Sequence, residues 1–104
     1  MIPEMSARDA ATALQQPGHI LLDVREAAEL ANAAVEGAVH IPMGEIPARL
    51  AEIDPEKTII CMCHLGGRSA QVGAFLAQQG YANVINLTGG IEAWAQDVDP
   101  GVVK

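Results

Sequence analysis

The chain has 104 residues, of which 50% are hydrophobic and 18% are charged, a composition typical of a folded domain rather than a disordered segment. Its 13 Asp and Glu against 6 Lys and Arg give a formal charge of −7, which argues against binding nucleic acid or an anionic membrane by bulk charge. With no signal-peptide pattern, no apolar run of the roughly 20 residues that span a bilayer, and only two cysteines, we expect a cytoplasmic protein.

The predicted elements alternate between helices and short apolar strands. Ser6 is well placed to cap a helix that runs to about Gln16, where Pro17 and Gly18 end it. The later expected strands are 20–22, 39–41, 58–63 and 84–87, and the later expected helices are about 26–33, 45–53, 68–79 and 91–94. Fully apolar strands separated by helices indicate an α/β fold whose parallel sheet is covered on both faces, although they do not give the strand order. We expect one domain over 1–104, with a core at 4–96 and a loose tail at 97–104.

The segment after the longest apolar run carries the candidate chemistry. Its residues are Cys63, His64, Leu65, Gly66, Gly67, Arg68 and Ser69. Ligands bind at the carboxyl ends of parallel strands, and a glycine-containing loop that opens a helix can turn its amides toward one point. Such amides lower the pKa of a thiol and make it a nucleophile. Between residues 58 and 91 the only formally charged side chain is Arg68, so we expect a locally positive loop.

Other interpretations of the two cysteines are weaker. Cys61 fits a buried core residue, and a Cys61–Cys63 disulfide would have poor geometry. A zinc site made with His64 lacks a fourth ligand. Cysteine-dependent phosphatases place five residues between the cysteine and the arginine, whereas four lie between Cys63 and Arg68. The shorter loop favours a sulfur atom over a phosphoryl group.

Four segments together resemble the rhodanese family of sulfurtransferases over about residues 4–96. They are Asp23-Val24-Arg25-Glu26 with Glu29, Gly37-Ala38-Val39-His40-Ile41-Pro42, the loop from Cys63 to Ser69, and Gly89-Gly90-Ile91-Glu92-Ala93-Trp94. The resemblance implies a five-stranded, mostly parallel sheet flanked by helices, and Cys63 as the sulfur carrier in a six-residue loop. The chain lacks the histidine that often precedes the second motif. It has His64 where members that use thiosulfate often carry a basic residue.

The hypothesis is a sulfurtransferase that moves sulfur from a donor such as thiosulfate to a thiol, a cyanide ion or a thiol-bearing protein. A persulfide on Cys63 is the intermediate, the loop from His64 to Ser69 binds substrate, and no cofactor or metal is needed. Asp23 and Arg25 either line the mouth of the site or form a structural bond, with Arg25 paired to a helix carboxylate. The alternatives are a persulfide carrier or regulatory binding module and, less favoured, a phosphatase or arsenate reductase.

Overall fold

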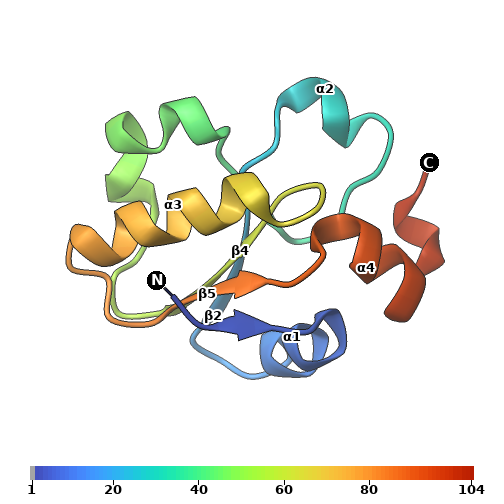
Figure 1. Cartoon of the computed structure of the whole chain (residues 1–104), viewed down its shortest axis with the longest axis horizontal. Coiled ribbons are helices and arrows are strands. Elements are labelled where there is room, and N and C mark those ends of the chain that lie inside the picture. Colours follow the sequence, from blue (N-terminus) through green and yellow to red (C-terminus); the bar gives the residue numbers. More distant parts are fainter. Residues whose placement is uncertain (1) are drawn as a thin grey trace.

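The computed structural model describes residues 2–104, and Met1, the first residue of the predicted domain, lies outside the described residues. A five-stranded sheet occupies the centre of the molecule (Figure 1). Its strands are β1 (Glu4–Met5), β2 (His19–Asp23), β3 (Val39–His40), β4 (Thr58–Met62) and β5 (Val84–Leu87). They are ordered β1-β5-β4-β2-β3, and every neighbouring pair is parallel. The predicted α/β fold with a parallel sheet is confirmed, and β1 is the strand that the sequence did not indicate.

Helices cover both faces of the sheet, as expected. The α-helices are α1 (Ala7–Leu14), α2 (Ala27–Leu30), α3 (Gly67–Gln78) and α4 (Gly90–Asp97), and the 3-10 helices are η1 (Met43–Glu45), η2 (Pro47–Glu52) and η3 (Pro100–Val102). In Figure 1, α3 lies above the sheet, and α1 and α4 lie below it. None of the helices within residues 2–104 combines the length and the apolar character needed to cross a membrane.

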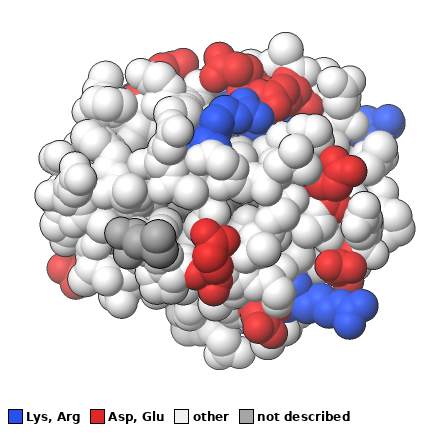
Figure 2. Space-filling view, in the orientation of Figure 1, with Lys and Arg blue, Asp and Glu red and all other residues white. Residues whose placement is uncertain are grey.

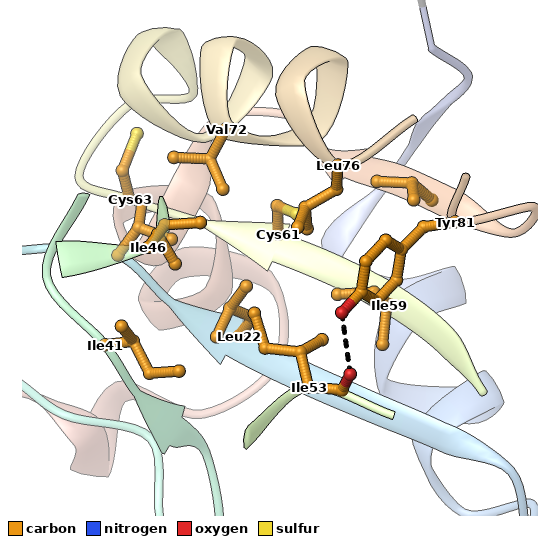
Figure 3. Close-up of a cluster of buried hydrophobic side chains, with 12 residues drawn as sticks. Leu22, Ile41, Ile46, Ile53, Ile59, Cys61, Cys63, Val72, Leu76 and Tyr81 are labelled. Atoms are coloured by element: carbon orange, nitrogen blue, oxygen red, sulfur yellow. Dashed lines mark hydrogen bonds between the residues drawn. The ribbon is translucent and has the colours of Figure 1, made fainter. Parts of the chain in front are cut away.

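Alternate residues of β4 enter two separate cores. Ile59 and Cys61 pack beneath α3, whereas Ile60 and Met62 face the opposite side of the sheet. The core beneath α3 also contains Cys63 and is drawn in Figure 3. The side chains of β4 are therefore fixed on both faces by burial, which holds the end of the strand rigidly in place.

Three predicted segments differ in the structure. The helix expected at 45–53 is instead two 3-10 helices, because Pro47 lacks an N–H donor and Arg49 has a non-helical φ of −119°. The helix expected at 26–33 is limited to α2. The tail expected to be loose is packed: Val102 is buried, and Val103 forms an antiparallel bridge with Ala33.

The strand order places a ligand-binding position between β2 and β4. These strands are neighbours, yet the chain leaves β2 toward β3 on one side and leaves β4 through α3 toward β5 on the other. Connections that diverge in this way leave a crevice at the carboxyl ends of the two strands, where ligands bind in open α/β sheets. Asp23 ends β2, and Cys63 directly follows β4.

Candidate active site

The backbone at Cys63 is held in place by the first turn of α4. The amide of Ile91 donates to the carbonyl of Cys63 at 2.9 Å, and the amide of Glu92 donates to that of His64 at 3.3 Å. Gly90 allows this close approach, because a Cβ atom there would collide with both carbonyl oxygens. In the last motif it is therefore Gly90 that permits the close backbone contact by which α4 positions the cysteine.

The sulfur of Cys63 lies inside the loop that opens α3. In Figure 3 it points toward that loop, away from the sulfur of Cys61. Its hydrogen-bond donors are the amide of Gly66 at 3.1 Å and the hydroxyl of Ser69 at 3.3 Å. Gly66 adopts a φ of +118°, which aims its amide inward at low cost only for glycine. The predicted convergence of loop amides on the cysteine is thus seen for Gly66, and the Ser69 hydroxyl is an additional donor.

The two cysteines have opposite electrostatic environments. Burial raises the pKa of Cys63, but hydrogen bonds from the Ser69 hydroxyl and from the amides of Ser69, Gly66 and Leu65 outweigh burial and bring the pKa below its usual value. Burial, assisted by Cys63, raises the pKa of Cys61 to about 12. Both thiols are free, and of the two only Cys63 has surroundings that lower its pKa.

Arg68, the expected positive charge of the loop, is bound to a carboxylate. Its Nη1 and Nη2 atoms lie 2.7 and 2.8 Å from the two carboxylate oxygens of Glu29. Glu29 is the second-last residue of α2. The expectation of a positively charged loop is therefore wrong, because its cation is neutralised by a residue from outside the 58–91 segment. Hydrogen bonding from Arg68 lowers the pKa of Glu29 to about 2, against the smaller effect of burial.

Asp23 and Arg25 form a buried ion pair with each other. Arg25 Nη2 lies 2.7 Å from Asp23 Oδ2, and both side chains are almost fully buried. Arg25 also donates to the backbone carbonyls of Glu29 and Ala33, so it braces the segment that carries α2. Arg25 thus forms the structural bond with Asp23 rather than with a helix carboxylate, and it also lines the cavity beside the loop.

The outer part of the loop is exposed. His64 Nε2 lies 2.9 Å from Glu92 Oε2, and Leu65 is 63% exposed. A cavity of about 470 Å³ opens beside His64 and is lined by Arg25, Glu29, Asn32, Ala33, His64, Ile91, Glu92, Ala95, Gln96 and Val103. The space between α2 and α4 can therefore admit a small molecule next to the loop.

Asn86 is a site residue that the sequence reasoning missed. It is 3% exposed on β5, and its side-chain oxygen accepts from Ser69 at 2.6 Å. Its amide nitrogen donates to Glu4 at 2.9 Å and to the carbonyl of Gly66 at 3.1 Å. The available signal was one polar residue inside an otherwise apolar strand, which calls for a buried hydrogen-bond partner.

Around the loop, the described residues form no metal cluster, and the face drawn in Figure 2 carries no basic patch. The face in Figure 2 shows scattered basic side chains and no continuous basic surface. Within residues 2–104, no three His, Cys, Asp or Glu side chains are grouped in a way that could hold a metal ion.

The sequence model of the rhodanese-like domain matches residues 6–97. This chain belongs to the rhodanese family. A sulfurtransferase of Allochromatium vinosum is 39% identical over 97 residues, which cover 92% of this chain and 91% of that protein. A thiosulfate sulfurtransferase GlpE of Pseudomonas savastanoi is 31% identical and covers 83% of this chain and 81% of its own length.

Solved rhodanese structures have the same fold. A rhodanese-related protein from Thermoplasma volcanium superposes with a TM-score of 0.84 at 28% identity, covering 92% of this chain and 93% of its own. The resemblance to rhodaneses and the implied sheet flanked by helices are both confirmed.

Proposed function

We propose that this rhodanese domain transfers a sulfane sulfur through a persulfide on Cys63. The observation that carries the proposal is the sulfur of Cys63 held between the Gly66 amide and the Ser69 hydroxyl, with its pKa lowered. These donors stabilise a thiolate before the reaction and a negatively charged sulfur after it. Relatives that are named sulfurtransferases support the same reaction class.

The transfer takes place in two displacements. The Cys63 thiolate attacks the outer sulfur of the donor, the donor's S–S bond breaks, and its electron pair leaves with sulfite when the donor is thiosulfate. A thiolate or cyanide then attacks the outer sulfur of the Cys63 persulfide and regenerates the Cys63 thiolate. Oxidation states balance without an external oxidant or a cofactor, and the kinetics are ping-pong.

The depth of the cysteine favours sulfur over phosphate. The Cys63 side chain is 1% exposed, and the loop places only four residues between Cys63 and Arg68. A terminal sulfur is a single protruding atom, whereas a phosphoryl group needs room and donors for three oxygens. Phosphate-ester hydrolysis that depended on Cys63 would overturn this assignment.

Intact-mass measurement tests the proposal. The protein is incubated with thiosulfate and, separately, with the persulfide of a small thiol. We expect a gain of one sulfur atom that cyanide removes. Cys61→Ser is the matched control. It should still gain the sulfur, because the Cys61 thiol that it lacks is buried, has a pKa of about 12 and takes no part in the reaction. If Cys63→Ser also gained the sulfur, or if no donor loaded the native protein, the proposal would fail.

A low-turnover carrier that passes its sulfur to a protein thiol is the second candidate. Leu65 favours it, since this large apolar side chain is exposed on the same loop as Cys63. A carrier would be loaded stoichiometrically but would show negligible multiple turnover with cyanide or small thiols. Sustained turnover with these acceptors would identify an enzyme instead.

A further inference from the structure

Every basic side chain on or beside the loop is paired with a carboxylate. Arg68 makes two hydrogen bonds with Glu29, at 2.7 and 2.8 Å. His64 lies 2.9 Å from Glu92. The guanidinium of Arg25 is buried against Asp23, as described above. Among the residues that the structure describes, the loop therefore presents hydrogen-bond donors to a ligand but no uncompensated basic side chain.

The charge close to Arg68 is negative on balance. Glu29 stays ionised throughout the physiological range, because its pKa is lowered to about 2. Glu26 adds a second carboxylate that is close enough to act on Arg68, and it receives the backbone amide of Glu29 in a capping box rather than a cation. Two carboxylates, those of Glu29 and Glu26, thus act electrostatically on the one guanidinium of Arg68.

This charge balance bears on which donor the loop can accept. Thiosulfate carries two negative charges and releases sulfite, which also carries two. The persulfide of an uncharged thiol carries at most one charge and releases one thiolate. Amides and a hydroxyl can stabilise a single charge on a sulfur that lies within the loop, whereas a doubly charged donor whose sulfonate lies outside the loop gains most from a free cation.

We propose that Glu29 is a specificity-determining residue: by holding Arg68, it disfavours dianionic donors and leaves persulfides of uncharged or cationic small thiols as the preferred donor class. This inference rests on the proposed sulfur transfer. The Cys63 thiolate attacks the outer sulfur of R–S–SH, the S–S bond breaks, and R–S⁻ leaves with the electron pair. The proton stays on the transferred sulfur, so no further reactant is required.

The test compares two donors on three proteins. Single-turnover loading of Cys63 is followed by quenched mass spectrometry, with thiosulfate and with 2-mercaptoethanol persulfide, in the native chain, Glu29→Gln and Glu52→Gln. Glu52 is the matched control, because it is a carboxylate paired with an arginine, Arg49, on η2. Glutamine keeps the size of the side chain but removes the charge that neutralises Arg68.

We expect the native chain to load faster from the persulfide than from thiosulfate. In Glu29→Gln, the thiosulfate-to-persulfide rate ratio should rise about tenfold, as expected for one unit charge acting on a dianion at close range. Added salt should reduce that rise, a response that a purely structural role of Glu29 would not produce. Glu52→Gln should leave the ratio unchanged.

Two results would overturn the inference while leaving the sulfur transfer intact. One is faster loading of the native chain from thiosulfate than from the persulfide. The other is an equal change in both rates in Glu29→Gln, which would give Glu29 a structural role only. By contrast, a chain that neither donor loads would refute the sulfur transfer itself.

Discussion

The hydroxyl oxygen of Ser69 lies 2.6 Å from the side-chain oxygen of Asn86 and 3.3 Å from the sulfur of Cys63. Asn86 cannot be turned around, because the carboxylate of Glu4 only accepts hydrogen bonds and so must face the amide nitrogen. A hydroxyl has one proton to donate. Asn86 and the thiolate therefore compete for the same proton, and residues on β1 and β5 influence the reactivity of a thiol at the end of β4.

Replacing Ser69 by alanine should make Cys63 less acidic. The substitution removes the side-chain donor that lowers the pKa of Cys63. Fewer hydrogen bonds then oppose the burial that raises this pKa. We expect the alkylation rate by iodoacetamide at pH 7 to fall about tenfold for each unit by which the pKa rises. A pH profile measured in the Cys61→Ser background reports Cys63 alone. An unchanged midpoint would show that the loop amides are sufficient.

Replacing Asn86 by leucine should have the opposite effect. Leucine has a similar shape but cannot accept a hydrogen bond, so the Ser69 hydroxyl becomes free to donate to the Cys63 thiolate. We expect a lower midpoint in the same pH profile. In the Ser69→Ala background the substitution should leave the midpoint unchanged, because no hydroxyl proton remains to be shared. A higher midpoint after the single substitution would assign Asn86 the role of holding the loop in place.

The ion pair between Asp23 and Arg25 should contribute strongly to stability. Arg25→Met would leave the Asp23 carboxylate buried without a partner, which typically costs about 3–5 kcal/mol in the free energy of unfolding. Arg49→Met is the matched control, since Arg49 pairs with Glu45 and Glu52 on the surface, where solvent screening leaves an ion pair with little effect on stability. Urea unfolding measures both. Equal losses for the two variants would contradict the prediction.

The parts of the site that the sequence predicts are local ones. The apolar run before Cys63, the glycines of its loop and the short distance to Arg68 can all be read within a dozen residues. Periodicity and turn chemistry decide such features before any tertiary contact forms. The strand end, the loop and the start of α3 were accordingly predicted to within a residue or two.

The contacts that tune the site could not be predicted in this way. Arg68 and Glu29 are 39 residues apart, and Asn86 and Glu4 are 82 apart. Each pair meets because of the strand order β1-β5-β4-β2-β3, which hydrophobic patterns do not encode. The two residues of β1 are also too few for periodicity to reveal, although their pairing with β5 brings Glu4 to Asn86.

Gly90 should be needed for the position of Cys63 rather than for the flexibility of the turn. Alanine there would strain a residue at a φ of +60° and push against the carbonyls of Cys63 and His64, which the first turn of α4 holds. Backbone strain of this kind typically costs about 1–3 kcal/mol, and displacing the carbonyls should also move the sulfur away from its donors. We therefore expect Gly90→Ala to lower the urea midpoint and to raise the midpoint of Cys63 alkylation.

Gly44→Ala is the matched control, because Gly44 has open space around its Cα and no positive φ, so both midpoints should stay close to those of the native protein. A Gly90→Ala protein that lost stability but kept the native alkylation midpoint would show that the loop holds the sulfur without help from α4.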